Sequence, residues 1–241
     1  MNAAVLFSFR RPWLRPRWSR VSREAAGKLL HTGLLFLALQ VAVALAYTSD
    51  NVVAIRVLGP EAVTDYSVPM RLFSVPMLLV SMSLAPLWPA YAESVARGDI
   101  DWARRTLARS LVVALVVAAP SALVLVAFGR WIVGVWVGPE VIPSLALLAG
   151  LGVWTVLSSL GNAVAMFLNG VGAIRFQVVI ALVMAVGALS AKIVLAGMIG
   201  VPGIIWGTVI AYAVFVVVPI AVFVPSLLSS MQRVHRWDRS C

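Results

Sequence analysis

The sequence predicts an all-α, polytopic membrane protein with six transmembrane helices. Hydrophobic residues make up 62% of its 241 residues, charged residues make up only 12%, and the mean hydropathy is +1.00. A soluble domain is typically about half apolar and a quarter charged. Six apolar stretches are each long enough to cross a hydrocarbon core of ~30 Å. We place a transmembrane region at 29–228, with spans at about 29–58, 61–88, 105–128, 141–169, 174–197 and 201–226.

A basic arm, residues 1–28, precedes the first span. Within it, Trp13, Leu14 and Trp18 stand among arginines. This pattern fits an amphipathic segment lying on anionic lipid, and it also fits a disordered basic linker. The apolar stretch at 1–5 is too short for a signal peptide and its arginines follow it, so we expect the first span to be retained.

The positions of Lys and Arg predict the orientation. Fifteen basic residues fall in the arm, in the second and fourth loops and in a basic tail at 229–241, against only Arg56 and Arg130 on the opposite side. Because cytoplasmic loops are enriched in Lys and Arg, we expect both termini in the cytoplasm. The formal charge of +10 could also indicate nucleic-acid binding. Basic residues beside spans are, however, the ordinary topology signal, so we expect no nucleic-acid partner.

Charged residues interrupt the first two spans, which the Gly59-Pro60 turn joins. Asp50 lies nine residues before Gly59 and Arg71 lies eleven after Pro60. At ~1.5 Å per residue, both would sit ~15 Å below the tip of a helical hairpin. We therefore expect Asp50 to pair with Arg71, and Arg56 to form a shallower pair with Asp65. Ionisable residues inside a membrane segment are costly, and by default they indicate a transport path.

The intramembrane charges allow several roles. Arg71 is the strongest candidate for a substrate contact because its planar guanidinium suits phosphate or carboxylate, although a structural ion pair with Asp50 is equally compatible. Asp50 could instead titrate and couple transport to protons, or it could join Asn51 in binding a cation. For Lys192 in the fifth span, we favour a side chain that reaches the outer interface over one that lines a cavity.

The later spans carry features of bending and close packing. Prolines predict helix breaks or kinks in the second, third and sixth spans, at Pro69, Pro76, Pro120 and Pro219. Glycines spaced four apart suggest close helix contacts, at Gly134/Gly138 and Gly203/Gly207. Gly-Pro turns predict tight outer hairpins at 58–63, 137–142 and 200–203.

Signatures of an enzyme are missing from the sequence. His31 and His235 have no Cys, Asp or Glu at metal-ligand spacing beside them, and no Gly-rich phosphate-binding motif precedes a Lys-Ser/Thr pair. The single cysteine, Cys241, allows neither an intrachain disulfide nor a multi-cysteine metal site. We therefore expect no catalytic residues, no metal and no cofactor.

A set of short motifs occupies the region between Thr48 and Arg105. They are Thr48-Ser-Asp-Asn51, Gly59, Tyr66, Arg71-Leu-Phe73, Pro86-Leu-Trp-Pro-Ala-Tyr-Ala-Glu93, Arg97-Gly-Asp99, Trp102 and Arg104-Arg105. Together they resemble the second half of bacterial lipid-linked oligosaccharide flippases of the multidrug/oligosaccharidyl-lipid/polysaccharide exporter superfamily. The four later spans agree mainly in hydropathy.

The resemblance implies one six-helix lobe of a MATE-like, two-lobe transporter fold in the cytoplasmic (inner) membrane. Its substrate would be a polyprenyl-pyrophosphate-linked oligosaccharide for surface polysaccharide such as O-antigen. Its partners would be membrane lipid, this substrate, and a complementary six-helix lobe or a second copy. Candidates for the cavity are Asp50, Asn51, Arg56, Asp65, Tyr66, Arg71 and Lys192. Candidates for the cytoplasmic gate and loop are Trp88, Tyr91, Glu93, Asp99, Trp102 and Arg105.

Only one lobe is encoded in the chain, so both a half-transporter and a truncated fragment fit the sequence. Two other functions also remain open. One is a cation-coupled multidrug exporter lobe of the same superfamily. The other is a non-transporting membrane scaffold of a polysaccharide synthesis complex.

Overall fold

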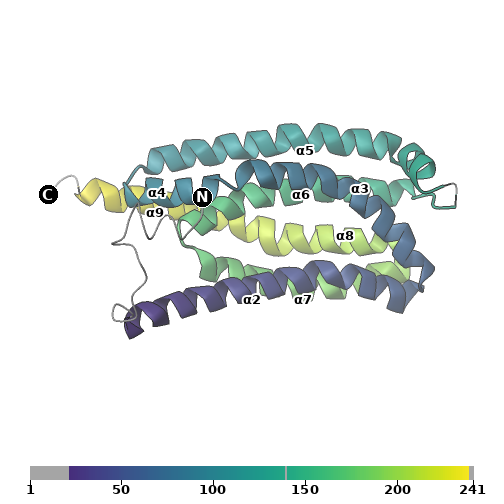
Figure 1. Cartoon of the computed structure of the whole chain (residues 1–241), viewed down its shortest axis with the longest axis horizontal. Helices are drawn as coiled ribbons and strands as arrows, with labels where there is room; N and C mark the ends of the chain where they lie inside the picture. Colours follow the sequence, from purple (N-terminus) through teal and green to yellow (C-terminus); the bar gives the residue numbers. More distant parts are fainter. Residues whose placement is uncertain (1–21, 139, 239–241) are drawn as a thin grey trace, which may run out of the picture. The chain divides into compact units, whose positions relative to one another are not determined.

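The computed structural model describes residues 22–138 and 140–238, and every regular element in these ranges is a helix (Figure 1). In this part of the chain, six helical stretches are long and apolar enough to cross a membrane. They are Leu29–Leu58, Glu61–Ala96, Ile100–Trp136, Leu145–Gly170, Ile174–Ile199 and Val201–Arg233. The predicted all-α class with six long apolar helices is therefore confirmed.

The chain divides into two compact units, residues 1–38 and 39–241. In the first unit, the described residues belong almost entirely to α2 (Arg23–Val53), which continues into the second unit. All later helices belong to the second unit. The predictions for the basic arm up to residue 21 and for the last three residues of the tail lie outside the described residues.

The first hairpin begins with a change of helix type. After α2 the chain forms a π-helical turn, η4 (Ala54–Leu58), and the Gly59 amide donates to the Ala54 carbonyl five residues back, at 3.1 Å. Gly59 then adopts a φ of 101°, which glycine reaches without steric cost. Pro60 follows directly before α3 (Glu61–Leu84), at a position where its missing N–H costs no helical hydrogen bond. The predicted tight turn is present.

The prolines have different effects on their helices. Pro69 and Pro76 lie inside α3, which continues through both, and α5 (Ile100–Trp136) continues through Pro120. In the sixth span a π-helical turn, η5 (Ala213–Val217), separates α8 (Val201–Tyr212) from α9 (Val218–Asp238). Pro219 has no N–H to donate to the carbonyl four residues before it. The π-helical turn therefore lies where the regular series of α-helical hydrogen bonds is interrupted.

Close backbone packing joins two pairs of neighbours, α5 with α6 (Leu145–Gly170) and α7 (Ile174–Ile199) with α8 (Figure 1). Between α7 and α8, an added Cβ at Gly203 would lie 2.2 Å from the Leu195 backbone, and one at Gly207 would lie 2.6 Å from the Lys192 backbone nitrogen. The close contact predicted for this glycine pair is thus present.

The other glycine pair, Gly134 and Gly138 in and just after α5, makes no such contact. An added Cβ at either position would meet nothing within 4 Å. The prediction of a close helix contact there was wrong for this chain, because the spacing of small residues permits an approach but does not supply a neighbouring helix.

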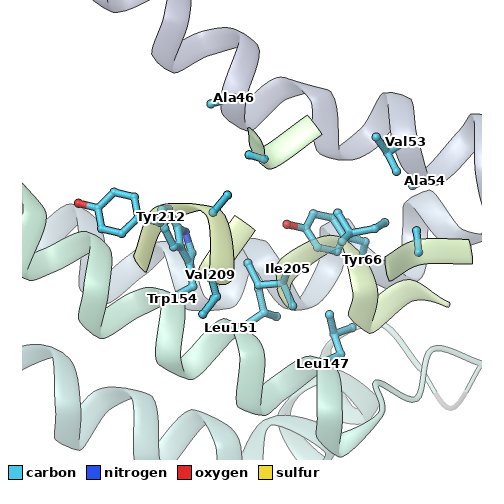
Figure 2. Close-up of a cluster of buried hydrophobic side chains, with 14 of the residues drawn as sticks. Ala46, Val53, Ala54, Tyr66, Leu147, Leu151, Trp154, Ile205, Val209 and Tyr212 are labelled. Atoms are coloured by element: carbon cyan, nitrogen blue, oxygen red, sulfur yellow. The ribbon is translucent and has the colours of Figure 1, made fainter. Parts of the chain in front are cut away.

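The main core of the second unit lies among α3, α6, α7, α8 and the C-terminal part of α2. Figure 2 shows its side chains converging from these helices, among them Ala46, Val53, Tyr66, Leu147, Leu151, Trp154, Ile205, Val209 and Tyr212. Large apolar side chains elsewhere, such as Leu123 at 70% and Val222 at 70%, are exposed. Exposed apolar surface on this scale is what a protein surrounded by lipid presents.

Candidate functional site

Asp50 lies in α2 and forms a buried ion pair with Lys192 of α7. The Asp50 residue is 6% exposed and Lys192 is fully buried. The Lys192 ammonium meets the Asp50 carboxylate at Oδ1, donates to the Ala46 carbonyl oxygen, and donates to the Ser49 hydroxyl at 3.2 Å. This cluster thus joins two helices that are far apart in the sequence.

Tyr66 of α3 completes the surroundings of the carboxylate. Its buried hydroxyl donates to Asp50 Oδ2 at 2.5 Å. Both carboxylate oxygens therefore have a partner, one from α7 and one from α3. Removing one member of a buried ion pair commonly costs about 3–5 kcal/mol, because the other charge is left without compensation. We expect the cluster to hold α2, α3 and α7 in one arrangement.

The structure corrects the expected pairing of Asp50 with Arg71. Arg71 is exposed, and no ion pair involving it is found among residues 22–138 and 140–238. Counting residues from the turn gives the depth of a side chain but not the direction in which it points around the helix. Asp50 points toward α7, whereas Arg71 lies on an exposed face of α3.

The expectation that Lys192 reaches the outer interface was also wrong. A lysine snorkels when its ammonium has no closer polar partner. In this fold Asp50 lies at the same depth as the Lys192 side chain and within its reach, so the ammonium stays buried. The predicted shallow pair is not formed either: Arg56 and Asp65 are both exposed, and the described part of the chain shows no ion pair between them.

Polar side chains form a second candidate region along α3, which we call the polar stripe. Its members on α3 are spaced three or four residues apart, so they share one face of the helix: Thr64, Ser67, Arg71 and Ser74. Asn51 of α2 extends the stripe, because its side-chain oxygen accepts a hydrogen bond from the Ser67 hydroxyl at 3.0 Å. All five side chains are exposed or partly exposed.

Asn51 and Arg71 of the stripe were predicted as cavity candidates, whereas the hydroxyl residues Thr64, Ser67 and Ser74 were missed. The signal was nevertheless present, since a helical spacing of hydroxyls around Arg71 in an apolar span is unusual. Polar side chains at such depth normally face protein or a water-filled cavity rather than lipid. We therefore expect the stripe to mark the face of α3 that lies away from lipid.

The predicted cytoplasmic gate residues build the connection between α4 (Leu87–Ala96) and α5. Asp99 caps α5 by accepting a hydrogen bond from the Trp102 backbone N–H at 3.0 Å, and Glu93 pairs with Arg97 at 3.2 Å. These residues lie around a small pocket of about 250 Å³. The Arg105 guanidinium donates to a backbone carbonyl one turn back, at 3.2 Å.

Tyr91 anchors this connection to the bundle. Its ring packs edge-on against Trp102 and Phe167, with centroids 5.9 Å and 5.4 Å apart. Its hydroxyl lies 3.0 Å from the Ser110 hydroxyl. Trp88, by contrast, is 40% exposed. Most of the predicted gate residues therefore make contacts that shape the turn between α4 and α5.

Comparison with known proteins matches residues 36–194 to the family described as MatE. The match includes Asp50, the polar stripe and Lys192, and it covers well over half of the chain. No curated protein and no solved structure matched. Together with the six apolar helices, the match establishes a multi-pass membrane protein with a MatE-like lobe. The chain belongs to the MatE family, and hence to the transporters of the multidrug/oligosaccharidyl-lipid/polysaccharide exporter superfamily.

Proposed function

We propose that this chain is one lobe of a flippase that moves a polyprenyl-pyrophosphate-linked oligosaccharide from the cytoplasmic to the outer leaflet, for surface polysaccharide synthesis. The observation that carries the proposal is the polar stripe, in which the exposed Arg71 stands between hydroxyl groups. A guanidinium binds phosphate oxygens through two parallel hydrogen bonds, and hydroxyls and amides suit sugars. Arg71 therefore takes the pyrophosphate in this mechanism.

The exposed stripe also supports a partner. Exposed polar groups on a membrane helix need a second protein surface or a water-filled cavity beside them. We propose that a complementary six-helix lobe, or a second copy of this chain, encloses the cavity in front of α3. Both lobes would share one orientation, with their termini in the cytoplasm and their basic loops on the cytoplasmic side of the inner membrane.

The cation-coupled drug exporter is less well supported by the geometry. Such a lobe needs a carboxylate that exchanges protons or metal ions during transport. The best candidate, Asp50, is held by the Lys192 ammonium and the Tyr66 hydroxyl, and it is almost fully buried. The members of the stripe are an arginine, three hydroxyl groups and an amide, and this combination favours an anionic substrate.

The proposal is tested by replacing Arg71 with Ala in the assembled transporter of the native cell. One charge-assisted hydrogen bond contributes about 1.5–3 kcal/mol, so substrate affinity should fall by about 10- to 150-fold. We expect surface polysaccharide to fall and the lipid-linked precursor to accumulate in the inner leaflet. Arg130→Ala is the matched control, because Arg130 is an exposed arginine of α5 outside the polar stripe.

The other functions give different results in the same cells. A drug exporter would keep normal polysaccharide in Arg71→Ala cells while drug efflux falls. A scaffold would lose polysaccharide only in proportion to the amount of protein left in the membrane. Quantifying the membrane-bound protein by immunoblot separates the scaffold from the flippase.

A further inference from the structure

The Lys192 ammonium is surrounded by the kinds of oxygen that bind metal cations. Its partners are the Asp50 carboxylate, the Ala46 backbone carbonyl and the Ser49 hydroxyl. Carboxylate, carbonyl and hydroxyl oxygens are also the preferred ligands of hard cations, and an ammonium group offers three donors but no acceptor. The three oxygens come from consecutive turns of one helix, α2, and the cation comes from another.

The fold holds the ammonium in this position through the backbone of α7. Gly207 of α8 contacts the backbone of Lys192 itself, and Gly203 contacts Leu195 one turn further along. Along α7 the main neighbour is α8, and the η4 turn that extends α2 also packs against α7. At the depth of Asp50, a long side chain is therefore what connects α7 to α2.

The charges in the cluster balance with one positive ion. The Asp50 carboxylate is the sole acidic group in contact with the ammonium among the described residues, and the Tyr66 hydroxyl orients this carboxylate by binding its other oxygen. One carboxylate with two neutral oxygens matches a single monovalent cation in charge. A second cation in the same cluster would leave a buried net positive charge.

We propose that the Lys192 ammonium occupies a monovalent-cation site between α2 and α7. A side chain of the lobe itself thereby supplies the positive charge that an ion bound from solution would otherwise supply. The packing of α2 is then independent of the salt around the protein. Removing the ammonium opens the site to Na⁺, whose ligands are the Asp50, Ala46 and Ser49 oxygens. This proposal concerns the stability of the lobe, and it does not depend on the substrate proposed above.

The test measures thermal unfolding of the purified full chain in detergent. Four proteins are compared: wild type, Lys192→Ala, the double variant Lys192→Ala/Asp50→Asn, and the control Arg130→Ala. Each is melted in NaCl, KCl and N-methylglucamine chloride at equal ionic strength. A ligand that binds only the folded state raises the melting temperature in a concentration-dependent way.

We expect wild type and Arg130→Ala to melt at the same temperature in all three salts. Lys192→Ala should melt about 3 °C or more higher in saturating NaCl than in N-methylglucamine chloride, and the rise should saturate with Na⁺ concentration. The double variant should lose this response because it lacks the carboxylate. A small amine such as methylammonium should also stabilise Lys192→Ala, since it restores the missing group.

Several results overturn the proposal. One is a wild-type melting temperature that responds specifically to Na⁺, because the site would then be open already. Another is a Lys192→Ala protein that melts identically in all salts. If Lys192→Ala cannot be recovered even when purified in NaCl while the double variant can, the proposal also fails, because Na⁺ should have replaced the ammonium.

Discussion

Replacing Gly207 with Ala tests the link between helix packing and the buried ion pair. The new Cβ would lie 2.6 Å from the Lys192 backbone nitrogen, 2.8 Å from its Cα and 2.9 Å from the Ala191 carbonyl carbon. Ordinary contacts of a Cβ are longer than ~3.4 Å, and all three of these neighbours are backbone atoms that cannot rotate away. Helices α7 and α8 must therefore separate.

The expected cost follows from two opposing terms. Overpacking a tight contact costs about 1–3 kcal/mol, and often more where backbone has to move. Alanine in a helix interior gains about 0.5–1 kcal/mol over glycine. The net result for Gly207→Ala should be a loss of about 1–2 kcal/mol in the free energy of unfolding. Because Lys192 moves with α7, its ammonium should also be displaced from Asp50.

Gly134→Ala is the matched control, since an added Cβ there meets nothing within 4 Å. It should be neutral or stabilising by up to about 1 kcal/mol. Unfolding is followed in detergent by titration with a denaturing surfactant, with tryptophan fluorescence as the signal. If Gly207→Ala is as stable as wild type, or if the two variants behave alike, the close contact between α7 and α8 does not constrain the lobe as argued.

Two further predictions concern the buried cluster. Asp50→Asn leaves the Lys192 ammonium without its carboxylate and should lower the free energy of unfolding by about 3–5 kcal/mol. Asp50→Asn/Lys192→Met should lower it by less than the single change, because no buried charge remains. Additive losses in a double-mutant cycle would contradict the ion pair. Tyr66→Phe removes one hydrogen bond to the carboxylate and should cost about 1.5–3 kcal/mol in the same unfolding assay. A Tyr66→Phe protein as stable as wild type would mean that the hydroxyl at 2.5 Å from Asp50 contributes nothing.

Features that depend on neighbouring residues could be predicted from the sequence. Apolar runs indicated the six helices, and the Gly59-Pro60 pair indicated the first hairpin, because helix length and turn chemistry are local properties. The spacing of Gly203 and Gly207 correctly indicated a close contact, since the partner helix directly precedes them across a short turn. In these cases the partner was given by the order of the chain.

Features that depend on distant helices could not be predicted in this way. Three complete spans lie between Asp50 and Lys192 in the chain, and neither residue indicates which way its helix is rotated. Residue counting alone therefore indicates Arg71 as the partner of Asp50, because Arg71 lies in the adjacent helix at equal depth. The π-helical turn η4 adds to this difficulty, because it alters the rotation of the chain just before the hairpin.

The corrected pairing changes the electrostatics of the proposed cavity. If Asp50 paired with Arg71, the two charges would cancel and the first two helices would present little net charge to a substrate. Lys192 instead neutralises Asp50 inside the bundle. The positive charge of the exposed Arg71 on the polar stripe is therefore not neutralised by Asp50. A lone guanidinium among hydroxyls attracts an anionic head group, and its attraction is stronger in a membrane cavity than in water. The buried lysine, which makes no contact with the stripe, thereby leaves Arg71 available for the pyrophosphate of the proposed substrate.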